Sequence, residues 1–169
     1  MSCEIDFKTL DRKKDEILKD YHNRAYLVFK NDLIKQEIKF NGIPVKVREI
    51  PIEDNKVQGF FHVISEQDKR SKIRLYKEER VKYIPFISKM IMEFEKCKHC
   101  TEDCPKIKIW TAPYLGKNSI LRTKIFFEKY DYIVILEKRN NYYQLVTAYV
   151  VDRKDRREDL LKEYTKYSS

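Results

Sequence analysis

The stretch YDYIVILEKRNNYYQLVTAYV, residues 130–150, consists of two apolar runs on either side of a polar turn. Short runs rich in Ile, Val and Tyr and bounded by Asn are typical of β-strands. The sequence therefore predicts strands over residues 132–137 and 142–151, joined by a turn at residues 139–141. Because the connection is so short, we expect the two strands to be antiparallel neighbours.

The segments that flank this hairpin extend the same pattern. Residues 106–111 and 123–127 also have strand character, and a loop through Pro113 and Gly116 separates them. Asp152 is predicted to cap a final helix. The apolar face of that helix comprises Leu160, Leu161, Tyr164 and Tyr167. The short connections predict a four-stranded antiparallel meander followed by a C-terminal helix.

The N-terminal half is mostly helical in pattern. Apolar residues recur every three or four positions over residues 8–34 and again over residues 74–96, which is the spacing of one helix face. Between them, the Asn-Gly pair at residues 41–42 predicts a hairpin, in which Pro44 indicates an edge strand. We therefore expect one α+β domain over residues 1–169, with N-terminal helices packed on the meander.

The net charge of the chain indicates which kinds of partner to expect. Lys and Arg number 36 against 27 Asp and Glu, which gives a formal net charge of +9. A basic protein attracts anions, so the expected partner is nucleic acid or a membrane surface. The alternative is that the basic side chains only lie on the solvent-exposed surface and bind no partner. The 12 Tyr and 9 Phe favour nucleic acid, because aromatic rings stack on unpaired bases.

Motifs that the sequence lacks argue against several further classes of protein. The chain starts MSCEID without an apolar run, so we expect no signal peptide. No apolar stretch approaches the ~20 residues of a membrane helix, and we therefore expect a cytoplasmic protein without a membrane partner. The sequence has neither a glycine-rich phosphate loop nor a His-Glu-x-x-His motif, which argues against an NTPase and a zinc protease.

A cysteine cluster has the spacing of metal ligands. The candidate zinc ligands are Cys97, Cys100 and Cys104. His99 or Cys3 could complete a tetrahedral site. Such a zinc would be structural and would hold together an insertion at about residues 97–105. Redox-labile or inert thiols are the alternative, because a second matching Cys pair is missing.

One histidine and two hydroxyl side chains are candidates for chemistry. His62 lies in the apolar, strand-like run 59–64, and an imidazole can move protons near neutral pH. The alternative is a satisfied core histidine. Strict alternation places Thr147 and Tyr149 on the face of the last strand that also carries Leu145. They could bind a phosphate oxygen or stack a base, or they could be ordinary strand formers.

Two arginines are candidates for anion binding. Arg80 shares a helical stripe with Ile84, so we expect it to face inward. A buried guanidinium must be paired or must bind an anion, and its planar fork suits a phosphate. An ion pair with Glu79 or Glu137 is the structural alternative. Arg74 begins the same predicted helix, and its direction stays open.

Four segments carry a family resemblance: GFFHVIS (59–65), RLYKEERVKYI (74–84), YDYIVILEKR (130–139) and YYQLVTAY (142–149). Together they resemble the phage-associated branch of the barnase–EndoU–colicin–RelE-like (BECR) nucleases, over roughly residues 20–167. The resemblance implies N-terminal helices on a four-stranded meander. It also implies metal-independent RNA cleavage, in which the ribose 2′-hydroxyl attacks the adjacent phosphate and leaves a cyclic phosphate.

The resemblance further implies roles for individual residues. His62 matches the histidine after an aromatic pair and would be the general base or acid. Arg74 and Arg80 match basic helix positions and would stabilise charge on the phosphate. Thr147 and Tyr149 match a Thr-x-Tyr pattern and would position phosphate or base. The implied partners are RNA and, for a toxin, an antitoxin or immunity protein. A non-catalytic RNA-binding module or a zinc-stapled interaction module on the same fold is the alternative.

Overall fold

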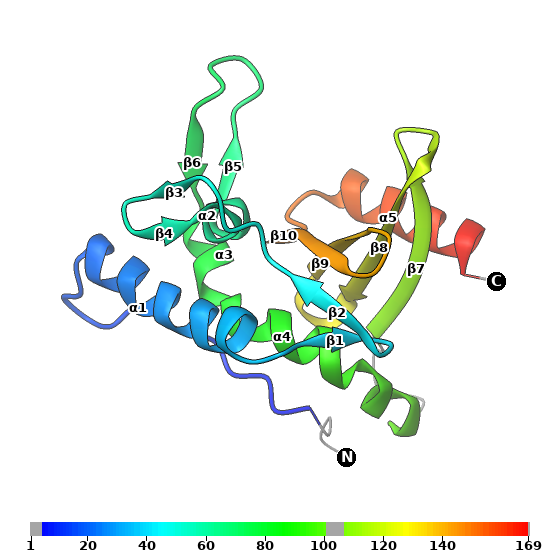
Figure 1. Ribbon diagram of the computed structural model, residues 1–169, viewed down its shortest axis with the longest axis horizontal. Helices are drawn as coiled ribbons and strands as arrows, with labels where there is room; N and C mark the ends of the chain where they lie inside the picture. The colour runs from blue at the N-terminus through cyan, green and yellow to red at the C-terminus, as the bar shows by residue number, and fades with distance from the viewer. Residues whose placement is uncertain (1–4, 101–106, 169) are drawn as a thin grey trace.

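In the residues it describes, 5–100 and 107–168, the computed structural model has a six-stranded sheet at its centre (Figure 1). In spatial order its strands are β1 (Lys39–Phe40), β2 (Ile43–Lys46), β10 (Tyr143–Val150), β9 (Tyr132–Lys138), β8 (Lys117–Phe127) and β7 (Ile107–Tyr114). β7 to β10 are successive antiparallel neighbours, whereas β2 pairs with β10 in parallel. The α+β class is confirmed, but the sheet is wider than the predicted meander because the β1–β2 hairpin joins it.

The β1–β2 hairpin forms around the Asn-Gly pair, as its sequence predicts. Asn41 and Gly42 have positive φ angles of 50° and 79°, which an Asn-Gly turn tolerates. Pro44 does not mark an edge strand, because β2 lies between β1 and β10. The pairing with β10 begins only at Val45, so Pro44, which has no N–H to donate, pairs only on the β1 side.

Helices cover both faces of the sheet (Figure 1). They are α1 (Leu18–Lys30), α2 (Gln58–Ile64), α3 (Glu78–Lys82), α4 (Ile84–Glu93) and α5 (Lys154–Tyr167), with short helical segments η1 (Asn31–Lys35), η2 (Phe94–His99) and η3 (Glu128–Tyr130). α1 to α4 share one hydrophobic core with the sheet. On the other face, Leu160 of α5 packs on Trp110 and Phe126. None of the helices in the described residues has the length and apolar character needed to cross a bilayer.

The apolar run that carries His62 is a helix, not the strand-like segment that we expected. It forms α2, which follows a small hairpin of β3 (Ile52–Glu53) and β4 (Lys56–Val57). Phe60, Val63 and Ile64 are buried, and their spacing places them on one helix face. A short run of consecutive apolar residues fits a buried strand and a buried helix equally well, so the pattern alone could not decide.

Arg74 begins a strand rather than a helix. β6 (Arg74–Tyr76) pairs with β5 (Ser65–Gln67) in a hairpin that projects from the body of the molecule (Figure 1). The helical part of this segment starts only with α3, which carries Arg80. The predicted ends of the outer helices also shift: α1 begins at Leu18 rather than near residue 8, and Arg153, not Asp152, is the N-cap of α5.

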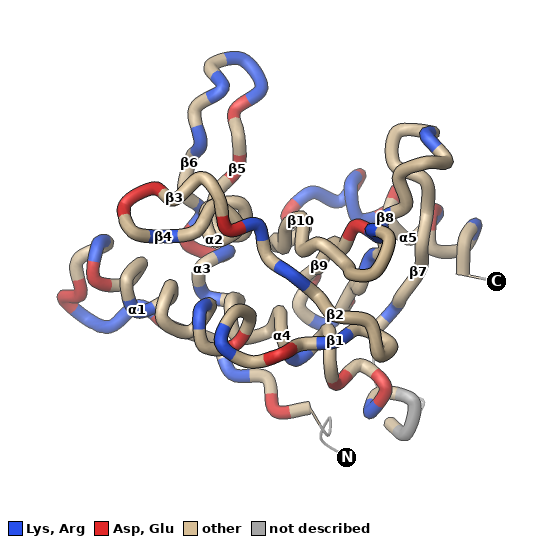
Figure 2. The backbone as a smooth tube through the Cα atoms, viewed as in Figure 1, with Lys and Arg blue, Asp and Glu red and all other residues tan. Residues whose placement is uncertain are grey.

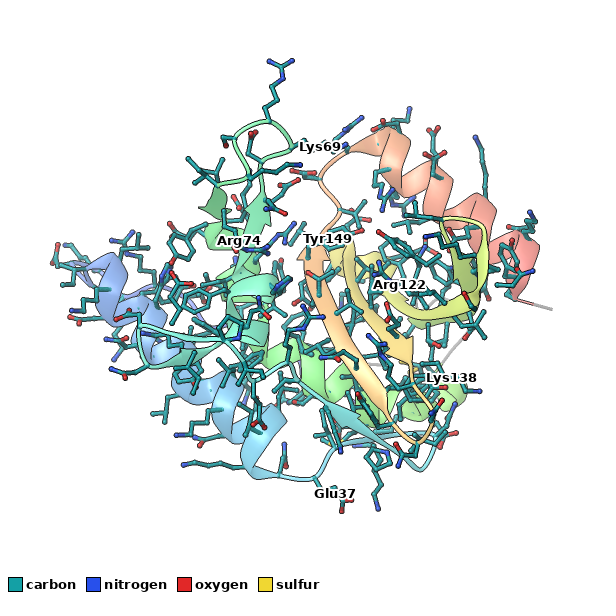
Figure 3. All side chains as sticks on the ribbon, turned by 45° about the horizontal axis from the view of Figure 1, so that its top comes forward. Glu37, Lys69, Arg74, Arg122, Lys138 and Tyr149 are labelled. Carbon is teal, nitrogen blue, oxygen red and sulfur yellow. The ribbon has the colours of Figure 1, made fainter. Side chains whose placement is uncertain are left out.

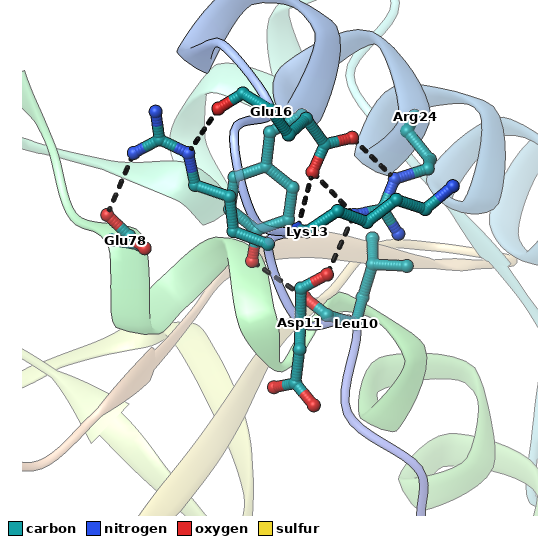
Figure 4. Close-up of polar contacts among 8 residues, drawn as sticks. Leu10, Asp11, Lys13, Glu16, Arg24 and Glu78 are labelled. Carbon is teal, nitrogen blue, oxygen red and sulfur yellow. Dashed lines mark hydrogen bonds and ion pairs between the residues drawn. The ribbon is translucent and has the colours of Figure 1, made fainter.

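A polar cluster holds the segment that precedes α1 (Figure 4). Arg24 donates from Nε to Glu16 Oε1 at 2.9 Å and from Nη2 to Oε2 at 2.8 Å. The backbone N–H of Lys13 also donates to Glu16, and Tyr21 Oη donates to the carbonyl of Leu10 at 2.6 Å. The hydrogen bonds from Arg24 and Lys13 lower the pKa of Glu16 to about 2. The extended N-terminal segment is thus fastened to α1.

Candidate active site

His62 lines a hollow of about 220 Å³, which we call the histidine pocket. Helix α2 forms one wall, and the segment after β2 and the strands β8, β9 and β10 form the others. The polar residues that line it are Arg48, His62, Arg122, Glu137, Arg139 and Gln144. The side chain of His62 is half-buried and borders open space, so it is not enclosed in the core.

Strand register brings polar side chains together on this side of the sheet. Arg122 of β8 lies opposite Glu137 of β9, and Glu137 lies opposite Gln144 of β10. Directly opposed residues of neighbouring strands point to the same face, so these three form a row. The row ends at β10, on which α2 packs, and this brings it to the helix that carries His62.

Glu137 is held between two arginines. Arg122 Nε donates to its Oε2 at 3.1 Å, and Arg139 Nη2 lies 2.7 Å from its Oε1. Arg122 is itself stacked on Tyr114, with its Cζ 3.4 Å from the ring centroid. The carboxylate is fixed in direction and is only 13% exposed. Glu137 therefore does not pair with Arg80, which was one alternative for that arginine.

Backbone contacts fix the position of His62. Thr147 Oγ1 donates to the carbonyl of His62 at 2.9 Å, and the N–H of Gly59 donates to the carbonyl of Arg48 at 2.7 Å. A Cβ at residue 59 would lie 3.1 Å from that oxygen, so a larger residue there would push the Arg48 segment away from α2 by a few tenths of an ångström. Burial, and then the charges of Arg74 and Arg48, lower the pKa of His62. The imidazole of the free protein is therefore mostly neutral at pH 7.

Arg74 and Arg80 meet at one buried serine. Arg74 Nε donates to Ser65 Oγ at 2.9 Å, and Arg80 Nη1 donates to Ser65 O at 2.7 Å. Both arginines are half-buried, and burial lowers the pKa of each. No carboxylate of the described residues forms an ion pair with either of them. Arg80 faces inward as predicted, and it is held by a carbonyl rather than by Glu79.

Arg80 lines a second hollow of about 580 Å³, which we call the arginine–tyrosine hollow. Its guanidinium carbon lies 5.1 Å from the ring centroid of Tyr149. Arg156 Nη2 donates to the hydroxyl of the same tyrosine at 3.4 Å. Figure 3 shows Arg74 and Tyr149 on facing elements, with Lys69 beyond them on the hairpin and Arg122 on the far side of β10.

The predicted site residues are thus distributed over two neighbouring hollows. His62 lines the histidine pocket, whereas Arg80 and Tyr149 line the arginine–tyrosine hollow. Arg74 lies close enough to influence His62, and Thr147 supports the backbone of α2. Whether each residue takes part in catalysis stays a prediction.

Sequence reasoning missed the other polar residues of the histidine pocket. They are Arg48, Arg122, Glu137, Arg139 and Gln144. The available signal was weak: Glu137 ends an apolar strand, and Arg122 has the opposite charge on a neighbouring segment. Only the strand register reveals that the two are directly opposed.

The cysteine cluster lies partly outside the described residues. Cys97 is buried, and Cys100 is partly exposed with its Sγ 3.8 Å from the carbonyl of Lys96. Cys3 and Cys104 fall outside residues 5–100 and 107–168, and the side chain of His99 is not described. The described residues contain no group of three His, Cys, Asp or Glu that could hold a metal ion. Zinc binding therefore stays a prediction.

Comparison with other proteins adds no family assignment. Neither protein-family models, nor curated proteins, nor solved structures match this chain. The BECR-like architecture therefore stays a prediction, and the function has to be argued from the geometry of the two hollows.

Proposed function

We propose that this protein is a metal-independent endoribonuclease of the BECR-like type whose chemistry takes place in the histidine pocket. The observation that carries the proposal is the meeting of His62 and Glu137 in one pocket lined by arginines. Cleavage by the 2′-hydroxyl needs a group that accepts a proton, a group that donates one, and cations around the phosphate. Each requirement has a matching side chain in this pocket.

Glu137 and His62 divide the proton transfers. The Glu137 carboxylate accepts the proton of the 2′-hydroxyl while that oxygen bonds to phosphorus. The bond from phosphorus to the 5′-oxygen breaks, and the His62 imidazolium donates its proton to that oxygen. The products are a 2′,3′-cyclic phosphate and a free 5′-hydroxyl. A strand without a 2′-hydroxyl cannot react by this route.

Substrate binding favours the protonated form of His62, which takes its proton from water. In the free protein the charges of Arg74 and Arg48 contribute to its low pKa. A bound phosphodiester places negative charge beside those guanidinium groups and offsets their effect, so the pKa of His62 rises when the substrate binds. The acid form is thereby favoured when a phosphate is present to react.

The arginines act on charge and on orientation. Arg122 and Arg139 fix the carboxylate of Glu137, and a guanidinium retains further N–H donors after one such bond. Those donors and the exposed Arg48 stabilise the negative charge that develops on the phosphate oxygens. No metal ion is needed in this scheme.

The test is cleavage of single-stranded RNA in the presence of EDTA. The wild-type protein should release products that end in a cyclic phosphate, and it should not cut the 2′-deoxy strand of the same sequence. His62→Ala and Glu137→Gln should each reduce kcat by roughly 10²–10⁴-fold. His22→Ala is the matched control, because His22 is a half-buried histidine that lines a different hollow on α1. Equal cleavage by the wild type and by His62→Ala would overturn the proposal.

A non-catalytic RNA-binding module is the second candidate. Arg74 and Arg80 support it, because half-buried guanidinium groups without carboxylate partners can bind phosphate and need no chemistry. In that case the wild type would bind RNA in a salt-dependent way and leave it intact.

A further inference from the structure

We infer that the arginine–tyrosine hollow binds an unpaired nucleotide next to the cleaved bond, so that the substrate is a single strand that runs along β10 beyond its pairing with β2. This inference rests on the proposed function for the position of the cleaved bond. The nucleotide would be held by a stacked base and by a phosphate on arginine.

The hollow is a recess between two walls. The β5–β6 hairpin and α3 contribute Lys69 and Arg80 to one wall, and the connection from β10 into α5 contributes Tyr149 and Arg156 to the other. Figure 2 shows Lys and Arg along the tip of this hairpin and at the start of α5. Basic side chains therefore approach the recess from both sides, as a phosphate backbone requires.

The lining of the hollow is basic on balance, because it has five basic residues against three acidic ones, Glu66, Glu79 and Asp152. Within residues 5–100 and 107–168, Lys69, Arg80 and Arg156 form no ion pair, whereas Lys77 lies 3.9 Å from Glu66. Arg80 is already fixed by the carbonyl of Ser65, so its fork loses little freedom on binding phosphate. Glu66 is near enough to act on the charge of Arg80 but forms no ion pair with it, so a phosphate would supply the direct counter-charge of this half-buried guanidinium.

Tyr149 provides a surface for a base. Its ring is half-buried, packs near Arg80, and has its hydroxyl contacted by Arg156. An aromatic ring held in an open basic recess can stack on a base of any sequence, because every base has a π-face. Bases in a duplex are stacked on one another and are not free for such contact. The recess therefore favours a single strand.

The two hollows lie along one strand. Gln144, Leu145 and Val146 line the histidine pocket, and β10 from Tyr149 onward lines the arginine–tyrosine hollow. At roughly 3.3 Å per residue, Val146 and Tyr149 are separated by roughly 10 Å along β10. A phosphodiester chain of a few nucleotides can span that length. Ser65 provides a second connection between the two hollows. It binds Arg80 of the arginine–tyrosine hollow, and it also binds Arg74, whose charge lowers the pKa of His62 in the histidine pocket.

Binding of an RNA that cannot be cleaved tests the inference. The probe is a short, fluorescently labelled single strand in which every 2′-hydroxyl is methylated. Tyr149→Leu should raise its Kd roughly tenfold, because one stacked base is lost. The exposed pair Lys69→Gln with Arg156→Gln should weaken binding and flatten its dependence on salt. Lys162→Gln is the control, because it removes a charge from an exposed position of α5 outside the hollow.

Two results would overturn the inference. One is wild-type affinity in Tyr149→Leu and in the Lys69→Gln, Arg156→Gln double variant. The other is equal affinity of the wild type for a blunt duplex of the same sequence. Because the methylated probe needs no cleavage, this outcome is separate from the fate of the proposed function. If the protein binds the probe through Tyr149 but cuts no RNA, the nucleotide site is supported and the proposed nuclease function is refuted.

Discussion

Ser65→Ala is the sharpest perturbation of the arginine cluster. Ser65 is 1% exposed, accepts a hydrogen bond from Arg74 Nε at 2.9 Å and donates from the same hydroxyl to the carbonyl of Phe61. Alanine removes the hydroxyl and leaves the backbone carbonyl that holds Arg80. The substitution therefore removes the Nε hydrogen bond of Arg74 and keeps Arg80 in place. Arg74 retains only a longer hydrogen bond, of 3.4 Å, from Nη2 to the carbonyl of Ser65.

The expected loss of stability follows from these two hydrogen bonds. A hydrogen bond to a charged group contributes about 1.5–3 kcal/mol, and a neutral one contributes about 0.5–1.5 kcal/mol. We expect the free energy of unfolding to fall by about 2–4 kcal/mol. For a chain of this size such a change lowers Tm by about 5–15 °C.

The informative measurement is the titration of His62 by NMR. The charge of Arg74 contributes to the low pKa of His62, after burial. Because Ser65→Ala loosens Arg74, it should raise that pKa only part of the way toward its ordinary value. His22 is the internal control, because its pKa is lowered by burial and by Lys56 and Arg12. An unchanged pKa of His62 in a folded Ser65→Ala protein would refute the link between Ser65, Arg74 and the histidine.

Further predictions concern pH and metal. If His62 is the acid, kcat/KM should decline as the pH rises through the pKa of His62 in the free protein, which lies below the ordinary histidine pKa of 6.5. The decline of kcat should occur at higher pH, because bound substrate raises the pKa of His62. Glu16 has a pKa of about 2 in the folded protein against 4.5 ordinarily, so its contribution to stability is present above pH 4.5 and is lost as the pH falls toward 2. Thermal unfolding of Glu16→Gln should therefore depend less on pH over that window than the wild type does. Stoichiometric zinc after dialysis, lost in Cys97→Ser, would support a structural metal site, and its absence from the wild type would remove that site.

Local patterns predicted the C-terminal half of the sheet well. The strands of the 130–150 stretch are connected by few residues, so their pairing depends on contacts that are near in sequence. The Asn-Gly hairpin was predictable for the same reason, since two adjacent residues determine its turn. The position of that hairpin beside β10 was not, because it depends on a parallel contact between Val45 and Tyr143.

The candidate site was less predictable because it depends on register. His62 and Arg80 could be singled out from composition, since a histidine in an apolar run and an arginine on an apolar stripe are unusual in themselves. Glu137 gave no such signal. It lines the histidine pocket because it lies opposite Arg122 and Gln144 in the sheet. The sequence of one strand does not determine which residues of the next strand lie opposite it.

A bulge in β10 explains why Leu145 does not share a face with Thr147 and Tyr149, as strict alternation predicted. The register shifts between Leu145, which faces Leu136, and Thr147, which faces Ile135. Leu145 and Ala148 are consecutive core residues of β10 on the side of α1 to α4. They are three positions apart, whereas a regular strand places residues of one face two positions apart. Thr147 and Tyr149 are thereby turned away from the face that carries Leu145. Thr147 contacts α2, and Tyr149 borders the arginine–tyrosine hollow. An inserted residue that re-aims side chains beside a site is a recurring use of the β-bulge. The bulge lies between the residues of β10 that line the histidine pocket and Tyr149, which lines the arginine–tyrosine hollow, so it sets the direction in which Tyr149 points.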